Sequence, residues 1–534
     1  MNKLPQELMD KIVSLIPKTL SKSDNPLRKL DKAELIRPGL ATLSTSWQAA
    51  IEYRTFECLT VRNTELTEFV AIFSGIRRRQ ILRKLRFVIV LPTYSDEDCG
   101  KYETNQEREV NNILVNEALS RLLHELSTWP ACSRIRFELS VVSPMDWHYR
   151  GVDKLHSDKA AAFEGDRIDV FGDRYRYSNI RLINTDQPQV PCIQSFTDFS
   201  STRALDSTSW ISLMAKFPAI STFRLVIPDP WPFVHVQKKA RRELAVALEK
   251  TQISPETQEL VIEVEFHHYP HWLRLPDLTD SSHTDLLCAA LNNLIAGSNL
   301  QSLHYQGPIH PSFFWSTGPH ERPSSWASIT EMSIEFYPSS PSGQWYFKGS
   351  EDNPLHDIEI NDLLGPDVPR LPPGYGTKAD TNTAVEFMRS VGLITGEMDI
   401  PDPEQQFREI PDDEVIVPLL EAFARRLAHM PSLQYAELSF YTSLYNRSPS
   451  LVPRHHPFPR HPLYPPEQWT IYYSAPGKPH RCEGSLRKRD VDLSRAHVSF
   501  ELRGWMPDKH LVDLFRNVGK AANGEDAIIT FLQS

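Results

Sequence analysis

Two groups of histidines have the residue type that binds zinc or another transition metal. They are His267, His268 and His271 in FHHYPHW, and His455, His456 and His461 in RHHPFPRHP. Zinc needs ligands that converge from rigid elements. The first group follows an expected strand that ends at Pro270, and the second lies in extended, proline-rich chain. We therefore predict no metal site at either group.

Two runs of charged residues are candidates for binding a phosphate group or a cation. The basic run RRRQILRKLR, residues 77–86, is typical of a phosphate-binding patch or a nuclear signal, but its alternating apolar residues favour the solvated face of a folded element. The acidic run YSDEDCGKYE, residues 94–103, lacks the spacing and the glycine of a calcium-binding loop. We interpret it as an ordinary surface loop.

The common catalytic motifs are missing from the sequence. We find no G-x-S-x-G, no G-x-x-x-x-G-K-[ST] and no H-E-x-x-H. The prediction is a protein that is not an enzyme, with no catalytic residues, no cofactor and no metal. The alternative is an enzyme whose site is assembled from loops that the sequence alone does not pair.

The composition is that of a globular protein. Hydrophobic residues make up 40% and charged residues 24% of 534, and the formal net charge is −10, which argues against a nucleic-acid partner. No segment has the length and hydrophobicity of a membrane span or the pattern of a secretory signal. Six scattered cysteines without a CxxC pair favour buried thiols in a reducing compartment. We expect a cytoplasmic or nuclear protein with neither a nucleic-acid nor a membrane partner.

Seven segments share a spacing of apolar residues that predicts a strand, Φ-x-x-Φ-x-Φ. They begin at Leu82, Cys132, Ile220, Leu300, Ile329, Leu433 and Leu493. Four are preceded by amphipathic helices, in EALSRLLHELSTWP, SWISLMAKFP, LLCAALNNLIAGS and VPLLEAFARRLAHMP. A repeated helix and strand predicts an irregular, leucine-rich-repeat-like α/β solenoid. The alternative is an unrelated α/β domain with a mixed sheet.

Prolines interrupt this region twice. Of the 42 in the chain, many lie in residues 446–469 and in GPDVPRLPPGYGTKADTNT, residues 365–383. Such composition predicts long extended insertions. The tail from Trp469 reads strand, strand, helix, strand. We therefore expect an α/β region over 59–445, a Pro-rich loop over 446–468 and a C-terminal α/β cap over 469–534.

The first 58 residues predict a separate helical module. KLPQELMDKIVSLIP gives a helix with one apolar face, and a second apolar pattern follows in RPGLATLSTSWQAAIE, where Thr45 and Gln48 have capping-box spacing. Three short helices without disulfides or metal ligands bury too little surface to be stable alone. The module therefore needs a partner, either the rest of the chain or another protein.

These same residues resemble an F-box. LPQELMDKIVSLIP followed by LATLSTSWQAAIE has the order of that motif, and the resemblance to the fungal type extends to about residue 145. The link over residues 18–36 is longer and more polar than is usual in the family. The resemblance implies a three-helix F-box that binds a Skp1-like linker protein and, through it, a cullin-RING ubiquitin ligase. The matching contact residues are Leu4, Pro5, Ile12, Ile16, Leu40, Leu43 and Trp47.

The resemblance implies a function without catalysis. The chain would be the substrate-recruiting adaptor of a Skp1–cullin–F-box ubiquitin ligase, with an unknown protein substrate bound by the C-terminal body. The alternative is a protein-interaction scaffold whose F-box-like helices pack on its own body and bind no ligase.

Overall fold

The computed structural model shows an α/β protein. It describes residues 41–95, 103–146, 178–183, 186–198, 203–229, 234–264, 273–315, 326–349, 410–441, 468–479 and 492–532, with Lys11, Asp98, Tyr175 and 358–359. The chain divides into two compact units, unit 1 up to Ser221 and unit 2 from Thr222. Each is described by itself below.

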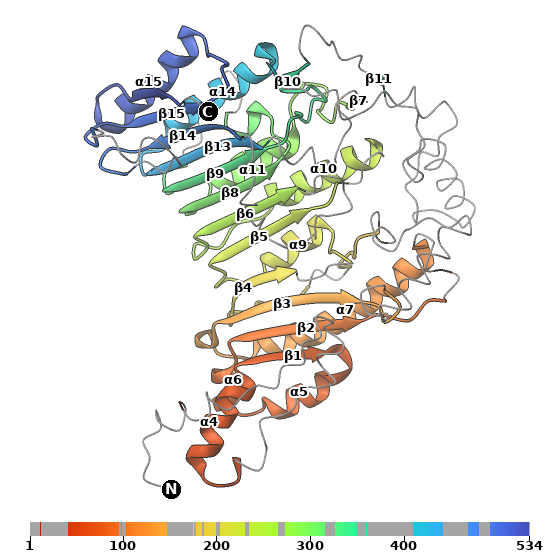
Figure 1. The fold of residues 1–534 in the computed structure, drawn as a ribbon. Coiled ribbons are helices and arrows are strands. Elements are labelled where there is room, and N and C mark those ends of the chain that lie inside the picture. The colour runs from red at the N-terminus through yellow and green to blue at the C-terminus, as the bar shows by residue number, and fades with distance from the viewer. Residues whose placement is uncertain are drawn as a thin grey trace, which may run out of the picture. The chain divides into compact units, whose positions relative to one another are not determined.

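In the described part of unit 1, helix α4 is followed by strands with intervening helices (Figure 1). Its strands are β1 (Cys58–Arg62), β2 (Lys84–Val90), β3 (Ile135–Val142) and β4 (Ile193–Asp198). Its helices are α4 (Thr45–Phe56), α5 (Leu66–Ile72), α6 (Ile76–Ile81), α7 (Asn105–Ser127) and α9 (Ser207–Met214), with 3₁₀ turns η1 (Asn63–Glu65) and η3 (Ala131–Ser133). Each of the first three strands pairs in parallel with the next.

Unit 2 carries the remaining strands, which lie side by side in chain order in Figure 1. They are β5 (Thr222–Ile227), β6 (Glu259–Val264), β8 (Ser302–Gly307), β9 (Glu331–Phe336), β13 (Tyr435–Tyr441), β14 (Gln468–Ser474), β15 (His497–Glu501) and β16 (Ile528–Phe531). The helices are α10 (Val234–Glu249), α11 (Leu286–Ala296), α14 (Asp413–Leu427) and α15 (Lys509–Asn523), with the 3₁₀ turn η5 (Pro311–Phe313). Two short pairs, β7 (Leu273–Arg274) with β11 (Ile358–Glu359) and β10 (Phe347–Lys348) with β12 (Ile410–Pro411), stand outside the large sheet.

The large sheet has 12 strands in the order β1-β2-β3-β4-β5-β6-β8-β9-β13-β14-β15-β16. It is mixed, because β14 runs antiparallel to both β13 and β15 while the neighbouring pairs are parallel. All seven segments predicted as strands contribute a strand to this sheet, and the four helices predicted in front of strands are α7, α9, α11 and α14. The tail is also confirmed as strand, strand, helix, strand, in β14, β15, α15 and β16.

The predicted irregular, leucine-rich-repeat-like solenoid is not detected among the described elements, and they show no clear N-terminal three-helix bundle. The strands begin at unequal intervals, with β8 and β9 only 29 residues apart and β9 and β13 separated by 104. The structure therefore shows a mostly parallel sheet whose strands alternate with helices along the chain.

The apolar pattern predicts the core well at most positions. Phe87, Phe137, Leu303, Ile334 and Leu438 are fully buried at their predicted strand positions. Two pattern positions are exceptions, because Cys132 is exposed and Leu493 is 43% exposed. Both precede the strand itself, where the chain has not yet entered the sheet. The core therefore follows the strands rather than the whole six-residue pattern.

Several sequence predictions concern residues that the structure does not describe. Both histidine groups and nearly all of the two proline-rich insertions and of the first two F-box-like helices lie outside the described residues. The prediction of buried thiols is wrong for Cys58 and Cys132, which are exposed, whereas Cys192 and Cys288 are buried. No helix in the described ranges combines the length and hydrophobicity needed to cross a membrane.

Candidate functional site

The predicted Skp1-binding residues are only partly visible. Leu4, Pro5, Ile12, Ile16 and Leu40 lie outside the described residues. Leu43, which directly precedes the N-cap residue of α4, is 57% exposed. Trp47 is half-buried and packs against Ala50 and Ile51. The structure therefore places an exposed leucine and a tryptophan together at the start of α4.

The start of α4 differs from the predicted capping box. Ser44, not Thr45, is the N-cap residue, and its hydroxyl accepts a hydrogen bond from the Trp47 backbone N–H at 3.3 Å. Gln48 instead donates to Glu52 at 3.2 Å on the helix surface. Both Ser44 and Thr45 are good capping residues by type, and the backbone of Ser44 is the one in the extended conformation that a cap requires.

The Trp47 indole has an unsatisfied polar atom. Its Nε1 atom is buried and has no hydrogen-bond partner among the residues described. A buried N–H without an acceptor destabilises a protein by about 1–3 kcal/mol.

The other end of α4 is fixed to the rest of unit 1. Glu52 forms an ion pair with Arg78 of α6 at 2.8 Å, and the Arg78 guanidinium lies over the Phe56 ring at 5.1 Å. Phe56 in turn meets Phe73 edge to face, with ring centroids 5.5 Å apart. Burial raises the pKa of Glu52, but hydrogen bonds from Arg78 and Gln48 outweigh it, so the pKa is lowered and the charged pair is favoured.

The basic run belongs to this internal framework. Its residues bond to acids of unit 1: Arg79 to Glu125 at 3.2 Å, and both Lys84 and Arg86 to Glu138 at 2.6 and 3.0 Å. The expectation of a purely solvated face is therefore wrong for these side chains. They compensate carboxylates within the unit instead of forming a free phosphate-binding patch.

The acidic run also has an internal role at its last residue. Glu103 is fully buried and forms an ion pair with the buried Arg203, whose Nη2 lies 2.6 Å from Glu103 Oε2. Asn111 donates to the same carboxylate at 2.7 Å. The interpretation as a surface loop is thus incorrect at Glu103, and the signal for it was weak because Arg203 lies 100 residues away.

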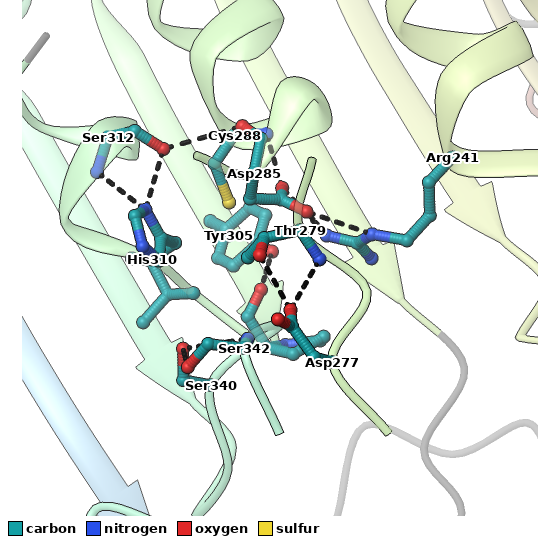
Figure 2. Close-up of polar contacts among 12 residues, drawn as sticks. Arg241, Asp277, Thr279, Asp285, Cys288, Tyr305, His310, Ser312, Ser340 and Ser342 are labelled. Atoms are coloured by element: carbon teal, nitrogen blue, oxygen red, sulfur yellow. Dashed lines mark hydrogen bonds and ion pairs between the residues drawn. The ribbon is translucent and has the colours of Figure 1, made fainter. Parts of the chain in front are cut away.

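A second buried polar group lies in unit 2, at the carboxyl end of β8. It joins α10, α11 and the segment after β8, and Figure 2 shows the Arg241 guanidinium directed at the Asp285 carboxylate. Arg241 donates from Nη2 to both Asp285 oxygens at 2.8 Å, and Nε lies 3.1 Å from Oδ2. Asp285 also caps α11 by accepting from the Cys288 backbone N–H at 2.7 Å. One carboxylate therefore holds two helices together.

The neighbouring groups have the residue types of an active site. The His310 Nδ1 accepts from the Ser312 backbone N–H at 3.2 Å and lies 2.9 Å from the Ser312 hydroxyl. Burial and the Asp285 charge raise the pKa of the Cys288 thiol well above its ordinary value. Burial lowers the pKa of His310. A protonated thiol is a poor nucleophile.

The hydrogen bonds of this group point to a structural role. Tyr305 donates to the Pro308 carbonyl at 2.6 Å, and Tyr346 donates to the Ile309 carbonyl at 2.6 Å. Asp277 accepts from the Thr279 N–H and hydroxyl at 2.8 and 2.6 Å (Figure 2). These bonds satisfy the backbone where the chain leaves the sheet. No group of three or more His, Cys, Asp or Glu residues in the described ranges is placed to hold a metal ion.

The sequence analysis missed Arg241 and Asp285. Asp285 directly precedes the apolar helix LLCAALNNLIA, which is the sequence signal of an N-cap. Arg241 gave no comparable signal, because it lies on a helix with several other basic residues. Only the packing of α10 against α11 selects it.

Comparison with known proteins adds no assignment. No protein-family model matches this chain, and no curated protein has a similar sequence.

Proposed function

We propose that this protein is the substrate-recruiting adaptor of a ubiquitin ligase of the Skp1–cullin–F-box type. The N-terminal helices would bind a Skp1-like linker protein, and the α/β body, interpreted as leucine-rich-repeat-like, would bind a protein target. The proposal rests first on the F-box-like order of residues 4–52.

One structural observation supports the proposal most directly. An exposed Leu43 and a Trp47 with an unsatisfied indole N–H lie at one end of α4, while Glu52 and Phe56 fix its other end to unit 1. Exposed leucine and half-buried tryptophan side chains are typical anchors of a protein interface. Because its far end is fixed to unit 1, α4 would hold a bound linker protein in a defined position relative to that unit.

The mechanism would need no catalytic residue in this chain. An adaptor that holds a target near a ubiquitin-loaded enzyme raises the effective concentration of the reacting groups. This is consistent with two buried acids of the structure, since Asp285 pairs with Arg241 and Glu103 pairs with Arg203 within the fold.

Co-purification with Skp1 tests the proposal. We expect Leu43→Asp, and separately Leu4→Ala with Pro5→Ala, to reduce the recovered Skp1 at least tenfold, because a charge or a truncation in an apolar interface is costly. Ile183→Asp is the matched control, since Ile183 is 61% exposed in unit 1 and lies outside the motif. Hydrogen exchange over β2 and β3 should be unchanged in all three proteins. Undiminished Skp1 recovery with the Leu43 and Leu4–Pro5 variants would contradict the proposal.

The ion pair between Glu52 and Arg78 favours a second candidate, an interaction scaffold that binds no ligase. In that protein the N-terminal helices would pack wholly on the body. Limited proteolysis distinguishes the two candidates: cleavage before Ser44 with release of the N-terminal fragment supports the adaptor, and protection of that fragment in the isolated protein supports the scaffold.

A further inference from the structure

Unit 1 buries three charged side chains near the carboxyl ends of β2 and β3. They belong to Glu103, Asp146 and Arg203, which are 0%, 4% and 1% exposed. We call these three residues, with the residues that hydrogen-bond to the two acids, the edge cluster. The hydrogen-bonding members are Tyr94, Asn111, Ser143, Tyr175 and Ser178.

The arginine of the edge cluster is paired with one of the two acids. Arg203 Nη2 lies 2.6 Å from Glu103 Oε2. The same carboxylate accepts from the Ser178 hydroxyl and, at 2.7 Å, from the Asn111 amide. The Arg203 guanidinium also lies over the Tyr175 ring, 4.5 Å from its centroid. Glu103 therefore has a buried counter-charge.

Asp146 is held by neutral donors instead. Its Oδ1 accepts from the hydroxyls of Tyr94 and Tyr175 at 3.0 and 2.8 Å, and its Oδ2 accepts from the Ser143 N–H at 2.8 Å. Among the described residues, Arg203 is the cation whose charge favours an ionised Asp146, and it does so without an ion pair. Asp146 is therefore the less compensated acid.

The charges of the edge cluster do not balance when every group is ionised. Two carboxylates and one guanidinium leave one negative charge, and a buried charge without a partner is strongly unfavourable. A proton on one carboxyl removes the excess charge without moving the chain, whereas exposure to water removes the cost of burying it. Because Glu103 has the ion pair, Asp146 is the acid that takes the proton.

The edge cluster joins four segments of unit 1. Tyr94 follows β2 and Asp146 follows β3, whereas Glu103 precedes α7 and Arg203 precedes α9. The Ser143 hydroxyl also donates to the Pro92 carbonyl at 3.0 Å, which ties the first two segments together. The carboxyl ends of parallel strands are the edge at which open α/β sheets bind their ligands. The charge of the cluster therefore acts on segments at that edge.

We propose that the edge cluster is a pH-sensitive latch. It is closed while one carboxyl carries a proton, and it loosens when Glu103 and Asp146 are both ionised. Loosening releases the segments after β2 and β3 from each other and leaves the strands paired. The inference is independent of the proposed function, since an adaptor and a scaffold could both carry such a latch.

The direction of the pH dependence follows from Asp146. Burial raises the pKa of its carboxyl above the ordinary 3.8, although hydrogen bonds from Ser143, Tyr175 and Tyr94 lower it. Below pH 3.8 the carboxyl is protonated in the closed and the opened cluster alike. Above that pH the opened cluster loses its proton first, so opening becomes easier as the pH rises.

Hydrogen exchange of the full-length chain tests the inference. The amides of Asp146 and Ser178 are the reporters, because they donate to the carbonyls of Ser143 and Tyr175, both at 3.0 Å. We expect their protection factors, which are corrected for the intrinsic effect of pH, to fall at least about fivefold from pH 4.5 to pH 8. The amides within β2 and β3 should keep their protection.

Asp146→Asn should abolish this fall, because the amide cannot ionise. The amide oxygen can accept from the Ser143 N–H, and its two N–H groups can donate to the hydroxyls of Tyr94 and Tyr175, since a phenol oxygen also accepts. Glu117→Gln is the matched control, because it removes an exposed acid of α7. Its reporters should show the same fall as in the wild type.

Tyr175→Phe tests the latch without changing either acid. It keeps a ring beneath Arg203 but removes a donor to Asp146, and hydrogen bonds to a charged acceptor are the stronger kind. The fall in protection should therefore deepen at least about twofold. A wild type without the fall, an Asp146→Asn protein that retains it, or a Tyr175→Phe protein in which it is no deeper would each overturn the inference.

Discussion

The half-exposed faces of the two units differ in how they use charge. In unit 1 the face carries Arg62, Lys84, Arg86 and Arg136, and the one acid, Glu138, bonds both Lys84 and Arg86. Arg86 and Glu138 are directly opposite in register. On β5, β6, β8, β9 and β13 of unit 2 the corresponding positions carry five glutamates and Arg224.

The ionised form of Glu138 is favoured by the fold, whereas the ionised form of Glu335 is disfavoured by it. Glu138 is 7% exposed and lies between two cations, so its ionised form is compensated inside unit 1. Burial, and after it the charges of Glu437 and Glu263, raise the pKa of Glu335 to about 7. Unit 1 therefore compensates its buried strand carboxylate with two cations, whereas the strand register of unit 2 brings carboxylates close enough to raise the pKa of one of them.

The largest effect is expected from Glu138→Gln. Removing this charge leaves two cations facing an uncharged amide, and we expect a loss of about 2 kcal/mol in the free energy of opening of β2 and β3. Hydrogen exchange of those strands measures it separately from unit 2. Glu68→Gln, at an exposed position of α5, should change the same quantity by less than about 0.5 kcal/mol. Equal effects of the two substitutions would remove the contrast between the faces.

A glutamate-to-glutamine substitution at Glu335 in unit 2 should raise the stability of its strand, whereas the one at Glu138 lowers it. Below pH 4.5 Glu335 is protonated in both the folded and the unfolded chain. Between pH 4.5 and 7 the unfolded chain loses its proton first, so the stability from this group falls as the pH rises, and above pH 7 the full cost remains.

We therefore expect Glu335→Gln to stabilise β9 at pH 8 by about 1–2 kcal/mol, since the half-exposed position screens part of the shift, and to have little effect at pH 4. Hydrogen exchange of the β8 and β9 amides at both pH values measures this change. The introduced amide retains a hydrogen-bond partner in Gln306, so the exchange should slow only at the pH where the wild-type carboxylate is charged. A destabilised β9 at pH 8 would show that Glu335 is compensated in the folded chain.

The smallest effect on stability is expected from Arg224→Gln. Arg224 is 49% exposed, and exposed ion pairs contribute about 0–1 kcal/mol. The loss should be confined to β5 and β6, which the Arg224–Glu263 pair joins. Hydrogen exchange of the β5 and β6 amides measures it, and a loss above about 1 kcal/mol would show that this ion pair contributes more than an ordinary exposed pair.

Local sequence patterns were sufficient for much of the fold. Seven apolar patterns contribute to strands of the sheet, and four amphipathic segments are helices, because burial of one face imposes a period of two or 3.6 residues. The strands β1, β4 and β6 were not among those patterns. β1 has only the five residues CLTVR, Gln194 interrupts the alternation of β4 at a register shift, and β6 reads as six residues of plain period two, ELVIEV.

The candidate surfaces were predictable only in part. The F-box-like residues follow from one continuous motif, and Leu43 and Trp47 are the two that the structure describes. Asp285 had a capping signal, but its partner Arg241 lies 44 residues earlier, and Glu103 and Arg203 are 100 residues apart. Pairing at such separations depends on how helices and strands pack, which local periodicity does not encode.

By itself the sequence determined where the strands and helices lie, since each needs only its own neighbours along the chain to show an apolar face. The tertiary structure decided which charges meet. Glu263, Glu335 and Glu437 stand 72 and 102 residues apart in the chain, and only the register of β6, β8, β9 and β13 places them on one surface. Their mutual repulsion is therefore a property of strand pairing, and no single segment contains it.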